Sequence, residues 1–295
     1  MNLTEDVLKR IEERYAGLSK GQKRLADYIL NHYDKAVYLT ASKLGQEASV
    51  SESTVVRFAI ELGYDGYPEL GAALEELVKN RLTSVQRMEV STGHINHEHV
   101  LASVLHADIE NLKDTLDEVD EEQFAKAVSM IKKARRVYIL GVRSCAALAS
   151  FLGFYLNFIC DDVKLIHTNS VSETFEQVLN VNDQDVFIGI SFPRYSKRTS
   201  RVMEFARSRG AKCIAITDSE LSPLVPLADN ALLGRSNMIS FADSLVAPLS
   251  VINALIVALS LEKQEEIKGS LADLESIWMQ YDVYNSDQGT GGSGL

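Results

Sequence analysis

The sequence has few cysteines and no surplus of positive charge. Its 295 residues include three cysteines, and aspartate and glutamate (41) outnumber lysine and arginine (30). Cys145, Cys160 and Cys213 show neither paired nor metal-type spacing, which excludes a disulfide scaffold and favours a reduced, cytoplasmic setting. The net charge of −11 excludes a bulk electrostatic attraction to nucleic acid or to an anionic membrane.

Targeting and membrane-spanning patterns are also missing. Met1 leads directly into the polar NLTEDVLKR, so we expect neither a signal peptide nor a transit sequence. Two runs without charged residues, 145–160 and 244–261, are apolar, but the longer one contains Pro248 and Asn253 and lacks an aromatic belt. We therefore predict two helices buried in a core or a subunit interface, and no membrane partner.

Residues 3–82 show helical periodicity, which predicts an all-α domain of five helices over residues 1–82. The pattern S-x-x-Q at 19–22 is a capping box, and Thr40 is a candidate N-cap. Gly63 suits a left-handed helix end. Residues 83–99 are the least patterned stretch and are expected to be a linker.

The hydrophobic pattern of the sequence changes after Arg136. Five short apolar runs, VYILG, VKLIH, DVFIGIS, KCIAITD and NALLG, alternate with helical patterns. Such alternation predicts an α/β domain over 100–285, with a five-stranded parallel sheet in a Rossmann-like three-layer arrangement. The Gly/Ser-rich tail, 286–295, is expected to be disordered.

The stretch TASKLGQEASVSESTVVRFAIELG contains two short predicted helices joined by a tight connection. This is the spacing of a helix-turn-helix, whose second helix lies in the major groove of DNA. On that helix Val55, Val56 and Phe58 are predicted on the buried face. Ser51 is predicted to cap the helix at the DNA-binding end, where the free backbone N–H groups can also bind phosphate. The side chains predicted to point outward towards base edges are Ser53, Thr54 and Arg57.

Two interpretations of this helical domain remain open on periodicity alone. A plain helical bundle with one exposed arginine fits the pattern as well as a DNA-binding domain does. Residues 1–89 contain 12 basic and 14 acidic residues, whereas nucleic-acid binding usually leaves a basic footprint.

Two loops that follow predicted strands have the chemistry of an anion site. In LGVRSCAAL, Gly141 is expected to allow a tight turn, and Arg143 and Ser144 precede a helix; in SFPRYSKRTS, Ser196 is expected to cap one. Ligands of open parallel sheets bind beyond the carboxyl ends of the strands, where helix N-termini favour anions. Further candidate contacts are Ser191, Arg194 and Lys197. Helix caps and a solvated cationic face would explain the same residues without a ligand.

Histidines offer two other candidates. Four of them lie between residues 94 and 106, but no cysteine or carboxylate spacing completes a ligand set, so neither a metal nor a cofactor is expected. His167 follows the second predicted strand, with Glu173 close behind. This pair has the chemistry of an acid and a base in an aldose–ketose isomerisation, although loop polarity explains both residues equally well.

The stretch SVSESTVVRFAIELGYDGYPEL resembles the helix-turn-helix signature of the RpiR family of bacterial transcriptional regulators. The resemblance implies that Ser53, Thr54 and Arg57 read operator DNA. It also implies that the second domain is a sugar isomerase (SIS) domain, so that nearly the whole chain is covered.

GVRSCAALA and SFPRYSKRTS are similar to the two phosphate-binding loops of SIS domains. Sugar-isomerising members carry Ser-x-Ser-Gly-x-Thr in the second loop, and the last four positions align with Ser196-Lys-Arg-Thr199. The resemblance therefore implies that Ser144, Ser196 and Thr199 contact a ligand phosphate. Lys197 replaces the glycine and Arg198 a position that is often acidic, which argues against a standard hexosamine phosphate.

Two functional hypotheses follow. The first is a transcriptional regulator that is not an enzyme, binds operator DNA as a homodimer or higher symmetric oligomer, and responds to a sugar phosphate or related phosphorylated metabolite. The alternative is an SIS-type sugar-phosphate isomerase whose helical domain serves assembly. An outward Arg57 favours the first hypothesis, and a His167–Glu173 pair facing one cleft would favour the second.

Overall fold

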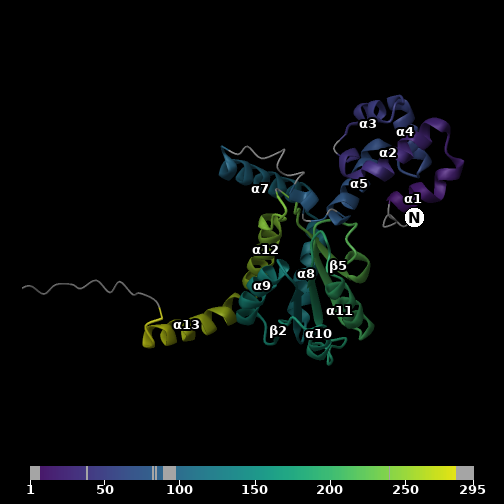
Figure 1. Ribbon diagram of the computed structural model, residues 1–295. Coiled ribbons are helices and arrows are strands. Elements are labelled where there is room, and N and C mark those ends of the chain that lie inside the picture. The colour runs from purple at the N-terminus through teal and green to yellow at the C-terminus, as the bar shows by residue number, and fades with distance from the viewer. Residues whose placement is uncertain are drawn as a thin grey trace, which may run out of the picture.

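The computed structural model describes residues 7–37, 39–81, 83, 85–88, 98–238 and 240–283. Within them, a helical region precedes a sheet covered by helices (Figure 1). The predicted tail at 286–295 and two histidines of the expected linker, His94 and His97, lie outside the described residues.

The first region is built from helices whose ends follow local sequence signals. They are α1 (Val7–Arg14), η1 (Tyr15–Gly17), α2 (Lys20–Ala36), α3 (Ala41–Glu47), α4 (Glu52–Glu61) and α5 (Tyr67–Arg81). Ser19 and Gln22 form the predicted capping box at the start of α2, and Thr40 Oγ1 accepts the N–H of Lys43 at the start of α3. Gly63 has a φ of 89° just after α4, as a left-handed helix end requires.

One hydrophobic core holds these helices together. Leu25 of α2, Leu44 of α3, Phe58 of α4 and Leu74 of α5 are all fully buried in it. Burial of this kind stabilises short helices that would be marginal alone. The sequence pattern therefore located the inward face of each helix correctly at these positions.

A tight turn joins α3 to α4. The N–H of Val50 donates to the carbonyl of Gly45 at 2.7 Å, and Ser49 adopts a left-handed φ of 53°. A Cβ atom at Gly45 would lie 2.8 Å from the Val50 carbonyl oxygen, so a larger residue would push the turn away. The two helices thus have the close connection of a helix-turn-helix.

The expected linker contains ordered structure where it is described. Thr83 and Gln86 bond each other's backbone N–H groups reciprocally, and residues 85–88 form a helical turn. The next helix, α7 (Val100–Asp117), leads towards the sheet (Figure 1).

The sheet has five parallel strands in the order β2-β1-β3-β4-β5, as the alternating pattern predicted. The strands are β1 (Val137–Gly141), β2 (Val163–Leu165), β3 (Val186–Ile190), β4 (Lys212–Thr217) and β5 (Asn230–Leu233). The remaining elements are α8 (Glu121–Lys133), α9 (Cys145–Ile159), α10 (Val171–Gln177), α11 (Lys197–Ser208), η2 (Val225–Leu227), α12 (Val246–Glu262) and α13 (Gln264–Gln280). In Figure 1, α13 extends away from the sheet.

Helices cover both faces of the sheet, which gives the predicted three layers. Alternate strand residues such as Ile139 and Ile188 pack with α8, α9 and α12, while Tyr138 and Phe187 pack with α11 on the other face. This period of two is what a strand buried on both sides requires.

The two apolar runs form helices, as predicted, and each helix is buried on one side only. Leu152 of α9 and Leu255 of α12 are fully buried in the core. Among the described residues, no single helix is long and apolar enough to cross a membrane, although α12 and part of α13, bent by 102°, would together pass on length and composition.

Candidate DNA-binding helix and ligand cavity

The outer face of α4 is formed by side chains spaced as one helical stripe. Ser53, Val56, Arg57 and Ile60 lie at positions i, i+3, i+4 and i+7, and all are exposed. The prediction that Val56 is buried is therefore wrong, since its side chain is 36% exposed. Periodicity misassigned it because Val55, beside it, already fills the inward position.

Three hydroxyl groups gather where α4 begins. Ser51 Oγ lies 2.9 Å from both Ser53 Oγ and Thr54 Oγ1. The predicted side-chain cap by Ser51 is absent from these described residues, because its hydroxyl bonds its neighbours instead. Thr54 is half-buried, and its methyl group would touch a Cβ at Gly21, so it faces α2 rather than solvent.

Arg57 lies on the exposed stripe, one turn beyond these hydroxyls. Its Nε donates to the Ser53 carbonyl at 3.2 Å, which aligns the side chain along the helix. The structure thus brings Ser51, Ser53, Thr54 and Arg57 together at one end of α4. Three of the four are exposed, and Thr54 supports them from the side.

Two other arginines of the helical region are engaged at the opposite end of α4. Arg10 Nη1 donates to the Leu62 carbonyl, and the guanidinium lies 4.8 Å from the centre of the Tyr64 ring. Arg14 donates to the Glu61 carbonyl. Cations at a helix C-terminus bond its last carbonyls and complement its dipole, so these residues stabilise the position of α4.

The two predicted anion loops lie side by side in the fold. The first connects β1 to α9 and the second connects β3 to α11, and β1 pairs directly with β3. Because β2 lies on the other side of β1, the strand order reverses between these two loops, where doubly wound sheets bind ligands.

A cavity of about 520 Å³, which we name the shared cavity, lies between the two loops. Residues 142–145 of the first loop and 191–197 of the second line it, together with 241–243, Leu245 and Arg87. The structure therefore brings six predicted residues to one cavity; these are Arg143, Ser144, Ser191, Arg194, Ser196 and Lys197.

In the first loop, the residue with positive φ is Arg143 and not Gly141, which was predicted to allow a tight turn. Arg143 adopts a left-handed φ of 58°. Gly141 is required for a different reason, since a Cβ there would lie 2.4 Å from the Cys145 carbonyl oxygen. Ser144 occupies the N-cap position of α9, but its exposed hydroxyl makes no cap bond within the described residues.

Cys145 also lines the shared cavity. Burial raises the pKa of its thiol above the usual range, which keeps the thiol protonated near neutral pH. A protonated thiol is a poor nucleophile, so the residue is suited to packing rather than to covalent catalysis.

In the second loop, hydroxyl groups hold the backbone in place. Ser191 Oγ accepts the N–H of Ser196 at 3.0 Å, and Ser196 Oγ accepts the N–H of Thr199 at 3.2 Å, which caps α11 as predicted. Arg194 between them adopts a left-handed φ of 62°. Both loops thus contain a strained arginine, a conformation that is sparsely populated outside functional sites.

Thr199 is the phosphate candidate that does not reach the shared cavity. It is fully buried beneath the loop, where its methyl group would touch a Cβ at Gly189. Within the described part of the chain, its Oγ1 has no hydrogen-bond partner.

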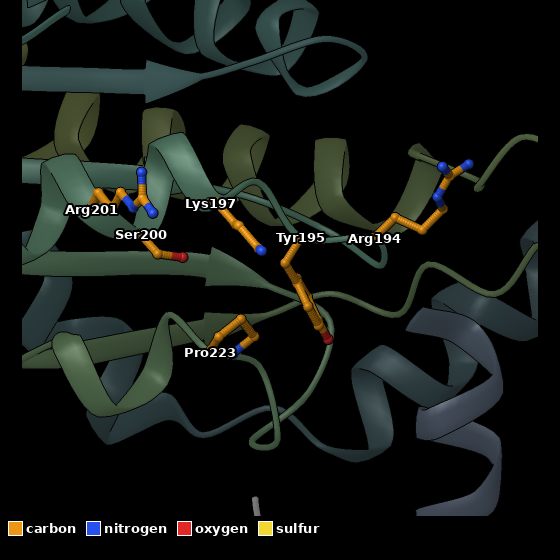
Figure 2. A pocket seen from close by; sticks show the side chains of 6 residues that line it. All are labelled: Arg194, Tyr195, Lys197, Ser200, Arg201 and Pro223. Carbon is orange, nitrogen blue, oxygen red and sulfur yellow. The ribbon is translucent and has the colours of Figure 1, made fainter. Parts of the chain in front are cut away.

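The second loop also borders a more open hollow of about 600 Å³ on its outer side (Figure 2). Lys197 and Tyr195 lie close together there, whereas Arg194 extends away from Lys197 and Arg201. Tyr195 is anchored through its hydroxyl, which donates to Asp218 Oδ1 at 2.8 Å. Arg194 and Lys197 both line this hollow and the shared cavity as well.

His167 and Glu173 are not brought to either hollow. Both are exposed, and Glu173 accepts a hydrogen bond from the Thr168 hydroxyl. Arg198 donates to the Thr168 and Asn169 carbonyls, which fixes this loop against α11. The described residues contain no group of three side chains suited to a metal ion.

Sequence reasoning missed two residues of the shared cavity, Arg87 and Asp243. Arg87 is buried and its Nη1 lies 2.6 Å from Asp243 Oδ1. The pattern T-x-x-Q at 83–86, a capping box like the one at 19–22, was the signal that this stretch is structured.

Comparison with known proteins follows this division of the chain. Residues 5–81 match the helix-turn-helix domain of the rpiR family, and residues 130–258 match the SIS domain. An HTH-type transcriptional regulator of Haemophilus influenzae is 29% identical over 270 residues, which cover 89% of this chain and 92% of that protein. The chain belongs to the RpiR family.

Two solved structures resemble this RpiR-family regulator. The sugar isomerase domain of an RpiR transcription factor from Sphaerobacter thermophilus is 29% identical, with a TM-score of 0.57 over 60% of this chain and 98% of that one. NanR of Vibrio vulnificus, complexed with ManNAc-6P, is 21% identical, with a TM-score of 0.56 over 93% of this chain and 98% of that one. The predicted pairing of a helix-turn-helix with an SIS domain is confirmed.

Proposed function

We propose that this RpiR-family protein binds operator DNA through the outer face of α4 and that a phosphorylated sugar in the shared cavity changes this binding. The observation that carries the proposal is the convergence of the β1 and β3 loops, with their serines, strained arginines and helix N-termini, at the switch point of the sheet. The complex of NanR with a sugar phosphate supports this ligand class.

On the DNA side, Arg57 is the proposed reading residue. An exposed guanidinium on the outer stripe of a recognition helix can donate two hydrogen bonds to a guanine edge. Ser53 and Ser51 would bond phosphate or bases near the start of α4, and Thr54 would position them. Val56, exposed beside Arg57, would contact a thymine methyl group.

On the ligand side, the N-termini of α9 and α11 would face the phosphate. Ser144 has an exposed hydroxyl that makes no cap bond in the described chain, so it can donate to the phosphate at no cost to the helix. Arg143, Arg194 and Lys197 would balance the charge. Ser196 would act mainly by holding the loop, and Thr199, buried beneath it, would act through packing.

We further propose that the protein is not an isomerase. The alternative required His167 and Glu173 to face one cleft, and both are exposed away from the shared cavity. A general acid or base must come within hydrogen-bond reach of the atoms that it serves.

A symmetric dimer in the cytoplasm is the proposed working form. Phe154 and Tyr155 of α9 are exposed and stack edge to face with each other, and Val257 of α12 is exposed too. Exposed aromatic clusters of this kind mark association surfaces. A stable monomer of residues 100–285 at micromolar concentration in analytical ultracentrifugation would contradict this proposal.

The test of the ligand class is a thermal-shift screen of the full-length protein against phosphorylated sugars, with the unphosphorylated sugars as controls. We expect one or more phosphorylated compounds to raise the melting temperature, because a ligand that binds only the folded state stabilises it. The Ser144→Ala variant should lose most of this rise. If no phosphorylated compound acts, or if the free sugar acts equally well, the proposed ligand class is wrong.

A further inference from the structure

Arg87 is an unusual component of the shared cavity because it comes from the stretch between the two folded regions. Its side chain is 2% exposed, and its Nη1 lies 2.6 Å from Asp243 Oδ1. The capping box of Thr83 and Gln86 sets its position, and the N–H of Arg87 donates to the Thr83 carbonyl at 2.9 Å. This turn follows α5, the last helix of the helix-turn-helix region.

Asp243 belongs to a loop that is tied both to the linker and to the helix that follows it. Besides pairing with Arg87, this loop contacts α7, the first helix after the linker. Ser244 Oγ donates to Asp108 Oδ1 at 2.5 Å, and the N–H of Arg235 donates to Thr115 Oγ1 at 2.9 Å. The same loop forms one wall of the shared cavity through Asp243 and its neighbours.

We propose that Arg87 is a ligand-binding residue of the shared cavity, where the ligand's phosphate competes with Asp243 for its guanidinium. The inference rests on the proposed function and adds a residue outside both anion loops. Both members of the pair line the cavity, so an anion there attracts Arg87 and is repelled by Asp243. A phosphate with more than one negative charge is a stronger partner for arginine than one carboxylate is.

The replacement of Asp243 by phosphate as the partner of Arg87 links the cavity to the DNA-binding region. Asp243 holds Arg87, and with it the turn at 85–88, against the sheet domain. When Arg87 pairs with the phosphate instead of Asp243, the turn at 85–88 is bound to the ligand in the cavity and is no longer held by the loop that contains Asp243. A shift of the turn is passed to α5, which ends a few residues earlier.

A purely structural ion pair makes the opposite prediction. If Arg87 and Asp243 only fasten the linker, removing either charge loosens the cavity wall and weakens ligand binding in the same direction. If phosphate and Asp243 compete, the two substitutions change ligand affinity in opposite directions. Substitution of Arg87 removes a contact to the ligand, whereas substitution of Asp243 removes the carboxylate that competes with the ligand. The sign of the Asp243 effect therefore separates the two roles.

The test is isothermal titration calorimetry of the full-length protein with inorganic phosphate and with glucose 6-phosphate as probes. We expect Arg87→Gln to weaken binding at least tenfold, and Asp243→Asn to tighten it at least threefold. Arg87→Lys, which keeps the charge and loses the planar fork, should fall between wild type and Arg87→Gln. This variant also serves if Arg87→Gln does not fold.

The matched control is Arg135→Gln. It breaks the Arg135–Asp185 pair, at 2.9 Å, which lies just before β1 and β3 and thus at the opposite ends of these strands from the shared cavity. It should leave the affinity for both probes within twofold of wild type.

Hydrogen exchange provides a second readout. Saturating phosphate should change the exchange of amides 85–88 in the wild type and leave them unchanged in Arg87→Gln.

The outcomes separate this inference from the proposed function. If neither probe binds the wild type, the competition for Arg87 is overturned, and the thermal-shift screen decides the proposed function separately. If the wild type binds and Arg87→Gln binds equally well, or if Asp243→Asn weakens binding as much as Arg87→Gln does, only the role of Arg87 is overturned.

Discussion

The outer face of α4 and the wall of the shared cavity both combine serines with arginines, but their hydroxyl groups are held differently. On α4, Ser51 bonds other side-chain hydroxyls, and Ser51 and Ser53 stay exposed. In the second cavity loop, Ser191 and Ser196 accept backbone N–H groups and fix the loop. We therefore expect that the exposed side chains of α4 can be substituted at little cost to stability, whereas the serines of the cavity loop serve both binding and folding.

The largest effect on stability is expected at a feature that the two regions share. Each contains a glycine, Gly45 or Gly141, that lies against a backbone carbonyl group. We expect Gly141→Ala to destabilise the protein by about 3 kcal/mol and Gly45→Ala by about 2 kcal/mol, because each new Cβ would clash with a carbonyl oxygen. Gly71→Ala, in the middle of α5 with open space around it, should stabilise by about 0.5–1 kcal/mol. Urea unfolding measures all three, and a neutral Gly141→Ala would contradict the close approach of α9 to β1.

The next effect concerns α4 alone. Arg57→Ala should weaken operator binding by about 1–3 kcal/mol if the guanidinium reads a guanine, while the melting temperature stays unchanged. Arg24→Ala, which removes an exposed arginine of α2, controls for the loss of charge. Fluorescence anisotropy with operator DNA and with scrambled DNA separates base reading from phosphate contact, since loss of a phosphate contact lowers both affinities about equally. An Arg57→Ala variant that binds the operator as tightly as wild type would contradict the assignment of α4 as the recognition helix.

The contrast within the cavity can be sharpened with two serines at helix N-termini. Ser196→Ala should lower the free energy of unfolding by about 0.5–2 kcal/mol, because it removes the cap of α11. Ser144→Ala should leave that free energy unchanged, because its hydroxyl makes no cap bond among the described residues. Chemical denaturation measures the free energy of unfolding of both variants. An equal loss in the two variants would contradict the predicted difference between the two loops.

The smallest effect uses Cys145 as a reporter of the cavity. Since burial raises the pKa of this thiol, its alkylation by iodoacetamide should be slow at pH 7 and still be rising at pH 9. A bound sugar phosphate should slow the reaction further. Mass spectrometry of the Cys145 peptide follows the rate, and a plateau of the rate below pH 8 would contradict the raised pKa.

Most of the fold was predictable because its signals are local. The capping box at 19–22, the glycine after α4 and five apolar runs located helices and strands whose burial depends on periodicity alone. The candidate site was less predictable, because its parts are brought together by the tertiary fold. Arg87 meets Asp243 across 156 positions of sequence, and no local pattern indicates that contact.

The errors have physical causes too. Val56 was misassigned because one helical turn has room for either of two adjacent valines on the inner face, and core packing selected Val55. Gly141 was predicted to allow a tight turn, but the approach of α9 is what requires it, and Arg143 adopts the strained φ. Thr199 matches a phosphate-binding motif in sequence, yet its side chain is fully buried and does not line the shared cavity, which only the tertiary fold decides.

The central part of the proposed function is that ligand binding in the shared cavity changes the affinity of α4 for DNA. The direct measurement is a titration of operator DNA, selected by the protein from a random pool, by fluorescence anisotropy with and without the best-binding sugar phosphate. We expect the ligand to change operator affinity by roughly 5- to 150-fold, and operator DNA to change ligand affinity by the same factor. The Ser144→Ala variant should bind DNA like wild type but lose most of the response to ligand. An operator affinity that stays the same when the wild-type cavity is saturated with ligand would contradict the account.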